Sequence, residues 1–204
     1  MRLQSALLSG FVVFDASLCI GTPYPRDQIL QQTPLVLAVL ALLWSAHRKP
    51  LSNAAFALTI AFLCLHAIGA RYVYSFVPYD AWTARLFGFE VTRVFGFHRN
   101  HYDRLTHFCF GLLLAYPLRE LVVRAARSTG WFINVVTFAV ITTFSALYEL
   151  AEWAVAMTFA PDWADRYLGQ QGDPWDAQWD MGLASLGALL ALVLIGVSSR
   201  SRSR

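Results

Sequence analysis

Long apolar runs constrain this sequence more than any other feature. A helix of roughly 17–25 mainly apolar residues crosses the hydrocarbon core of a bilayer. Six runs of about that length cover residues 4–21, 30–46, 54–74, 104–123, 131–158 and 178–198. With their loops, these runs use up the 204 residues. The sequence therefore predicts an all-α fold, a polytopic transmembrane helix bundle of about six spans that forms a single domain over residues 1–204.

Composition supports a membrane protein and argues against other classes. Only 14% of the residues are charged, whereas soluble domains average about 25%. The net charge is +3, but the basic residues lie in short clusters beside apolar runs, so we expect no nucleic-acid partner. Three cysteines without a CxxC spacing indicate neither a disulfide nor a zinc framework. The principal partner is the lipid bilayer, and the sequence leaves the oligomeric state open.

The distribution of lysine and arginine predicts the orientation, because cytoplasmic loops carry an excess of both. If the N-terminus is inside, the inner face collects Arg2, Arg48, Lys49, Arg119, Arg124, Arg127, Arg200, Arg202 and Arg204. The outer face collects fewer, so we expect both termini in the cytoplasm. The apolar start of the chain is interrupted by Asp15 and lacks an A-x-A cleavage site. We therefore expect a first transmembrane helix there instead of a signal peptide.

The segment between the third and fourth spans, about residues 75–103, is long for a small bundle. Loops of this length usually carry a function or structure of their own. Its aromatic residues include Phe76, Tyr79, Trp82, Phe87 and Phe89. We expect a short segment here that lies in the outer headgroup region.

Ionisable residues gather at the predicted outer ends of several spans. A rise of about 1.5 Å per residue places the acids of the fifth span at its outer end, and the fourth and sixth spans begin on that side. The residues concerned are Asp103, His107, Glu149, Glu152, Asp176 and Asp180, with His66 and Arg71 near the outer end of the third span. The first six form pairs three or four positions apart, so each pair shares one helix face. This convergence predicts a polar pocket.

Carboxylates at bilayer depth need a partner, which can be a cation or an arginine such as Arg71 or Arg104. Oxygen ligands with one or two imidazoles suit zinc, manganese, iron or magnesium. Local structure offers another explanation, since Asp103 follows Asn100 by three residues and Asp176 follows Asp173 by three, as in capping boxes. A lone His66 on an apolar helix is more often a hydrogen-bonded core residue than a ligand.

Three local strings carry a family resemblance. They are HYDRLTHF at 101–108, YELAEW at 148–153 and GDPWDAQWDM at 172–181. In this order they closely resemble the YjdF family of bacterial inner-membrane proteins, and the resemblance covers about residues 30–198. It implies a multi-pass protein of the bacterial cytoplasmic membrane and supplies no reaction. The first string is also similar to a stretch of VanZ-like membrane proteins, in which a lysine takes the place of Arg104.

The sequence leaves three functions open. The first is a metal-assisted hydrolase or transferase that acts on a membrane-associated substrate, such as a lipid or a molecule with a similar headgroup. In it, a divalent metal is held by His107, Glu152, Asp176 and Asp180, with Glu149 as the general base and Arg71 or Arg104 binding the substrate; Asp103, Asp173 and His66 are secondary candidates. The second is a structural or assembly protein in which the same cluster forms salt bridges. The third is a cation- or proton-coupled transporter, which the scarcity of polar groups in the inner half of the spans disfavours.

Overall fold

The computed structural model describes residues 2–48, 50–159 and 164–201. Helices in these ranges are α1 Arg2–Cys19, α2 Pro25–Arg48, α3 Asn53–Arg71, α4 Tyr79–Phe87, α5 Val91–Phe95, α6 Tyr102–Ala126, α7 Trp131–Phe159, α8 Ala164–Leu168 and α9 Asp176–Ser201. The predicted all-α fold is confirmed for the described residues. Lys49, Arg202 and Arg204, on which part of the predicted orientation rests, lie outside them.

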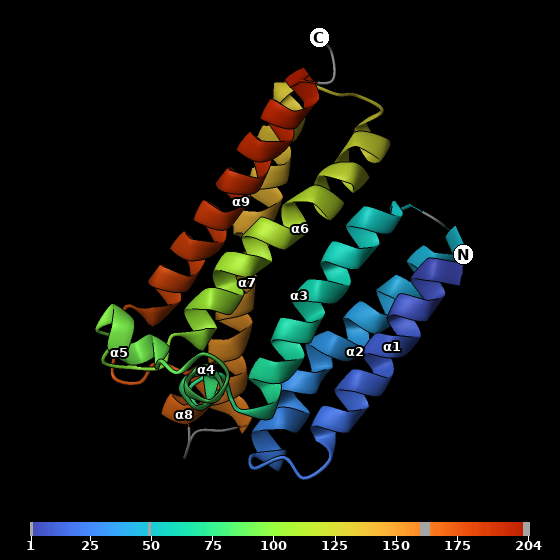
Figure 1. Cartoon of the computed structure of the whole chain (residues 1–204). Coiled ribbons are helices and arrows are strands. Elements are labelled where there is room, and N and C mark those ends of the chain that lie inside the picture. Colours follow the sequence, from blue (N-terminus) through green and yellow to red (C-terminus); the bar gives the residue numbers. More distant parts are fainter. Residues whose placement is uncertain (1, 49, 160–163, 202–204) are drawn as a thin grey trace.

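The six longest helices correspond to the six predicted spans. Helices α2, α3, α7 and α9 are long and apolar enough to cross a membrane, and α1 is a shorter apolar helix. Helix α6 has 25 residues and carries more charge. Helix α1 begins at the same end of the bundle at which α9 ends (Figure 1), as an even number of crossings requires. The orientation of this end relative to the cytoplasm stays a prediction.

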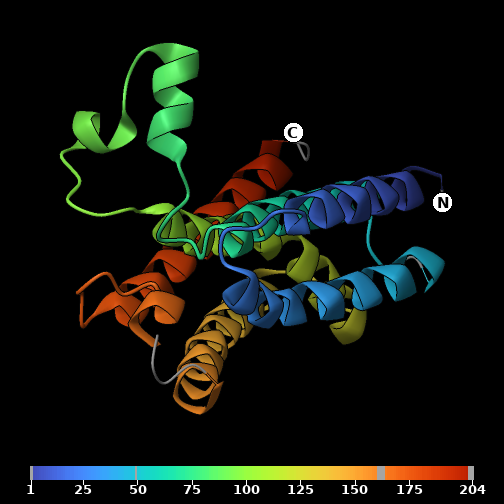
Figure 2. The ribbon, with the colours of Figure 1, turned by 90° about the horizontal axis from the view of Figure 1, so that it is seen from below.

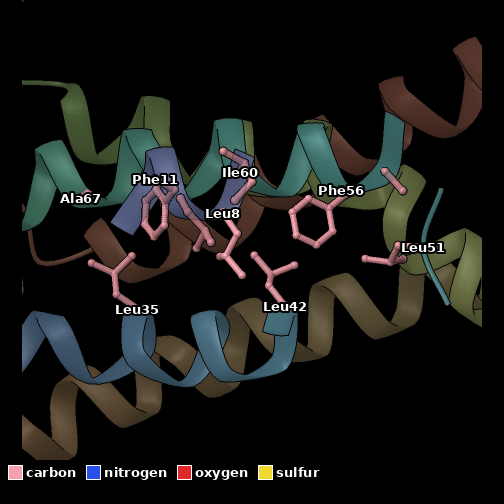
Figure 3. Packing of buried hydrophobic residues seen from close by; sticks show 10 residues of the cluster. Leu8, Phe11, Leu35, Leu42, Leu51, Phe56, Ile60 and Ala67 are labelled. Atoms are coloured by element: carbon pink, nitrogen blue, oxygen red, sulfur yellow. The ribbon is translucent and has the colours of Figure 1, made fainter. Parts of the chain in front are cut away.

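The bundle is built from two groups of three helices. Helices α1, α2 and α3 enclose a core of aliphatic and aromatic side chains, which includes Leu8, Leu35 and Phe56 (Figure 3). Helices α6, α7 and α9 enclose a second core around Ile141 and Ala188. The two groups meet where α3 packs against α6. Helices α2 and α7 pack mainly against helices of their own group.

The closest helix contact is between α6 and α9, which run side by side in the same direction (Figure 1). A Cβ atom added to Gly111 would lie 1.8 Å from the carbonyl oxygen of Ala184. One added to Gly187 would lie 2.1 Å from the carbonyl oxygen of Phe108. Both distances are far below van der Waals contact, so only glycine permits this approach. The contact fixes the register that brings the first turns of α6 and α9 together.

The segment between α3 and α6 contains the short helices α4 and α5. Each ends at a glycine in the left-handed conformation, Gly88 with φ 77° and Gly96 with φ 66°, which is the usual helix C-cap. The two helices project to one side of the bundle (Figure 2) and expose Leu86, Phe87 and Phe95. Their placement in the headgroup region stays a prediction.

Candidate functional site

Asp103, His107 and Asp180 form the centre of the site. One side-chain oxygen or nitrogen from each lies within 4.8 Å of the other two. Asp103 and His107 are one turn apart on α6, and Asp180 is in the second turn of α9. All three residues are buried, with exposed fractions of 8%, 8% and 2%. The close contact between α6 and α9 therefore assembles two carboxylates and one imidazole at the end of the bundle that carries α4, α5 and α8.

Glu149 on α7 adds a third carboxylate. Its Oε1 lies 3.4 Å from Nε2 of His107, and the same nitrogen lies 3.6 Å from Oδ1 of Asp103. Oε1 of Glu149 and Oδ1 of Asp180 are buried and have no hydrogen-bond partner within the described chain. In residues 2–48, 50–159 and 164–201, no lysine or arginine forms a salt bridge with Asp103, Glu149 or Asp180. We call Asp103, His107, Glu149 and Asp180 the inner cluster.

A second cluster lies beside the first and is neutralised. Arg99 contacts Asp176 at 2.8 Å, and Arg104 contacts Asp173 at 2.5 Å and Asp176 at 3.4 Å. Arg99 also donates to the backbone carbonyls of residues 169 and 170. We call these two arginines and two aspartates the ion-pair network. It joins the first turn of α6 and the loop before it to the start of α9 and the loop before that. The structure thus places Asp173 and Asp176 with arginines and not within the group of potential ligands.

The two predicted capping boxes are not formed as such. The backbone N–H of Asn100 donates to the side chain of Gln171, so it is not available to Asp103. The N–H of Asp173 donates to the carbonyl of Gln170. Asn100 does cap the following turn, because its Oδ1 accepts a hydrogen bond from the N–H of Tyr102 at 3.0 Å. Asp173 does the same, because its Oδ1 accepts a hydrogen bond from the N–H of Trp175 at 3.0 Å. This hydrogen bond, together with Arg104, holds the pKa of the Asp173 carboxyl below its usual value.

Glu152 faces a different set of partners. Gln31 on α2 donates to its Oε1 at 3.3 Å, and the hydroxyl of Tyr148 donates to the amide oxygen of Gln31 at 3.3 Å. These bonds link the two helix groups through α2 and α7. The structure therefore does not bring Glu152 into the group of Asp103, His107 and Asp180.

The remaining predicted residues are His66 and Arg71 on α3. Nδ1 of His66 is 2.5 Å from the hydroxyl oxygen of Tyr74, and its Nε2 is buried without a described partner. Arg71 donates to backbone carbonyls at the end of α1, including those of Ile20 at 2.9 Å and Gly21 at 3.3 Å. Arg71 thus closes the C-terminal end of α1 and makes no contact with the inner cluster in the described structure.

Several residues of the site were missed from the sequence. Arg99 is not among the predicted site residues, although it lies two residues before the string at 101–108. Gln31 is a polar residue inside a predicted span and is 1% exposed, which is a signal that hydropathy reasoning could have used. Tyr74 follows α3 with a φ of 50°, and nothing in the sequence indicates its contact with His66.

The centre of the site fits a small divalent cation. Zinc, manganese, iron and magnesium take oxygen ligands with imidazole at about 2.0–2.2 Å, so ligand atoms around one ion lie at most about 4.4 Å apart. The separations of up to 4.8 Å in the group would need only a small inward rotation of side chains. The unpartnered oxygens of Asp180 and Glu149 supply acceptors that a cation and its water could use.

Sequence comparisons identify the family. The chain matches the family described as "Predicted membrane protein (DUF2238)" over residues 3–201. It is 36% identical over 168 residues to "Inner membrane protein YjdF" of Escherichia coli (strain K12), a match that covers 82% of this chain and 76% of the relative. No solved structure matches. The predicted resemblance to the YjdF family is confirmed, and that to VanZ-like proteins stays a prediction. The chain belongs to the DUF2238 family and is an integral inner-membrane protein.

Proposed function

We propose that this protein is a membrane-embedded, metal-assisted hydrolase or transferase that acts on a membrane-associated substrate at the outer face. The supporting observation is the inner cluster, in which three potential ligand atoms lie within 4.8 Å of one another and two neighbouring carboxylate oxygens have no described partner. Uncompensated buried charge is costly and is normally relieved by pairing or by a metal. The ligands are Asp103, His107 and Asp180, in place of the set predicted from the sequence.

A divalent cation bound here would supply a water of lowered pKa and would polarise a carbonyl or phosphoryl oxygen. Glu149 is placed to accept a proton from that water, because its Oε1 lies beside the ligating imidazole. The water oxygen would bond to the electrophilic carbon or phosphorus as the bond to the leaving oxygen breaks. Glu149 would then return the proton to the leaving oxygen. With an alcohol in place of water, the same steps give a transfer reaction.

The arginines have structural roles in this proposal. Arg104 is occupied by Asp173 and Asp176, and Arg71 by carbonyls of α1. Binding a lipid headgroup to either would require these bonds to break. We therefore assign Arg104 and Arg99 to holding α9 against α6, where Asp180 must lie.

The ion-pair network also supports a second candidate function. A structural or assembly protein needs fixed helix packing and no reaction, and the network of Arg99, Arg104, Asp173 and Asp176 supplies such a fixation. A purely structural function leaves the three carboxylates of the inner cluster without a role. For that reason we rank the structural function below the metal-assisted enzyme.

Metal analysis of the purified protein tests the proposal. We expect the wild type, purified without chelators, to retain a divalent transition metal or magnesium in a near-stoichiometric amount, and His107→Ala and Asp180→Asn to lose it. The matched control is Glu152→Gln, which changes a nearby carboxylate outside the group and should keep the metal. A wild type that binds no metal when supplied with zinc, manganese, iron or magnesium, or an unchanged metal content in His107→Ala, would reject the proposal.

A further inference from the structure

An apolar cleft of about 470 Å³ runs along the bundle between α2 and α7. Its walls come from α2, α3, α6 and α7. Leu37 and Phe144 line it and are 63% and 54% exposed, so they form a rim open to the side of the bundle. In a membrane protein, that side faces the bilayer. The volume lies within the range of roughly 300–1,000 Å³ that is typical of ligand pockets.

The two ends of the cleft differ in chemistry. One end is lined by His66, Tyr74, Asp103, His107 and Tyr148. The remainder is mainly apolar, and its polar side chains are the hydroxyls of Thr59, Thr106 and Ser145. The polar end thus includes two of the three proposed metal ligands. Ser145 and His66 each present a buried polar atom, Oγ and Nε2, that has no hydrogen-bond partner among the described residues. A ligand with hydrogen-bonding atoms at one end and a hydrocarbon chain beyond them would give these two atoms partners and fill the apolar part of the cleft.

The length of the cleft matches one leaflet. On α6 its lining extends from Asp103 to Leu114, which is eleven residues or about 16 Å at 1.5 Å per residue. The hydrocarbon core of a bilayer is about 30 Å thick, so one leaflet contributes about 15 Å. A lipid chain that enters from the side would therefore fill the cleft from its polar end to the middle of the membrane.

We propose that this cleft binds one acyl chain of a phospholipid from the leaflet at the start of α6, with the ester and phosphate region of that lipid at His66 and His107. A phospholipid is then the substrate class of the proposed enzyme, and this part of the inference rests on the proposed function. The lateral rim admits a lipid directly from the bilayer. The cleft brings the lipid's polar linkages to the inner cluster while the chain stays in an apolar environment.

Photolabelling in nanodiscs tests the inference. The probe is phosphatidylglycerol with a diazirine in the middle of one acyl chain, in nanodiscs of phosphatidylethanolamine and phosphatidylglycerol. Mass spectrometry of the labelled chain should find crosslinks at cleft residues such as Phe62 and Phe110, and added unlabelled phosphatidylglycerol should compete for them. Ala38→Phe fills the cleft and Leu37→Trp narrows its rim, so each should lower this labelling roughly tenfold, since a filled site no longer admits an occupant.

The matched control is Leu40→Trp, which adds the same side chain one turn along α2 at a similarly exposed position (57%) that does not line the cleft. Because Leu37 is on the surface, its variant remains informative if Ala38→Phe does not fold. Crosslinks confined to outward-facing residues, or equal labelling in Leu37→Trp and Leu40→Trp, would show only surrounding lipid and overturn the inference.

Metal content measured in the same samples separates the two proposals. If the cleft is labelled but no metal is bound, the lipid site stands and the metal-assisted enzyme is rejected. If metal is bound but the cleft is not labelled, the metal site stands and the lipid site is rejected.

Discussion

Nε2 of His107 on α6 lies 3.4 Å from Oε1 of Glu149 on α7, and that oxygen is buried without a hydrogen-bond partner in the described chain. The pair joins two helices at a position where two further carboxylates, Asp103 and Asp180, lie close by. An imidazole shared among three carboxylates leaves an excess of negative charge if all of them ionise. The structure thus distinguishes acids that are balanced by arginines from acids that need a cation or protons.

Glu149→Gln separates the proposed base from the proposed ligands. The amide removes one negative charge from the inner cluster and leaves Asp103, His107 and Asp180 unchanged. We expect the metal content to stay at the wild-type level, and the melting temperature of the metal-free protein to rise by roughly 2–4 °C, which corresponds to about 1 kcal/mol for a chain of this size. Atomic emission spectroscopy and thermal unfolding in detergent measure the two effects. Loss of the metal would instead place Glu149 among the ligands.

Gly111→Ala tests the helix contact that assembles the site. The added methyl group would collide with the backbone of α9, so the two helices must separate, at a cost of about 1–3 kcal/mol. We expect a lower melting temperature and a weaker metal affinity, because Asp180 moves away from α6. Gly182→Ala on α9 is the control, since a Cβ at Gly182 meets nothing within 4 Å. Equal effects of the two substitutions would contradict the assigned contact.

Arg99→Ala tests the ion-pair network. It removes a partner of Asp176, whose side chain is only 3% exposed, and breaking a buried pair of this kind costs about 3–5 kcal/mol. Arg124→Ala removes a more exposed pair with Glu120 and should cost about 1 kcal/mol or less. The free energy of unfolding, measured for both variants under the same conditions, gives the comparison. If Arg99→Ala is as mild as Arg124→Ala, the network does not hold α9 in place.

The lowered pKa of Asp173 makes one pH dependence predictable. Its carboxyl releases its proton more readily in the folded protein than in the unfolded chain. Its stabilising contribution is therefore fully present above the usual aspartate pKa of about 3.9 and is lost as the pH falls through the folded-state value. The difference in melting temperature between the wild type and Asp173→Asn should be constant near neutral pH and shrink below about pH 4. A difference that grows on acidification would contradict the assigned interaction.

The sequence was sufficient to predict the helices because bilayer thickness dictates their length. All six predicted spans overlap long helices, and the ends differ by a few residues. Pro25 occupies the first position of α2, and the predicted second span begins five residues later, because Arg26, Asp27 and Gln28 lower the hydropathy before it. Asp27 and Gln28 are nevertheless buried in the structure. Asp27 pairs with Arg166 of α8, and Gln28 donates to the backbone carbonyl of Leu18 at the end of α1.

The candidate site was predicted only in part. Helical rise placed the acids at one end, and the structure brings Asp103, His107, Glu149 and Asp180 together there. Helical rise could not show which acids pair with arginines and which do not, because that depends on the rotation of each helix about its axis. The rotation of α6 and α9 is set by the contact at Gly111 and Gly187. Arg99 reaches the site from a loop, and no helical periodicity predicts such a contact.

Zinc K-edge X-ray absorption of the zinc-loaded protein tests the central claim most directly, because it reports the atoms bound to the metal. We predict a first shell of nitrogen and oxygen at about 2.0–2.2 Å, with the outer-shell scattering of one imidazole. That imidazole signal should disappear in His107→Ala and persist in Glu152→Gln. A shell with sulfur, which would come from a cysteine at about 2.3 Å, or a wild-type spectrum without imidazole scattering, would contradict the proposed site.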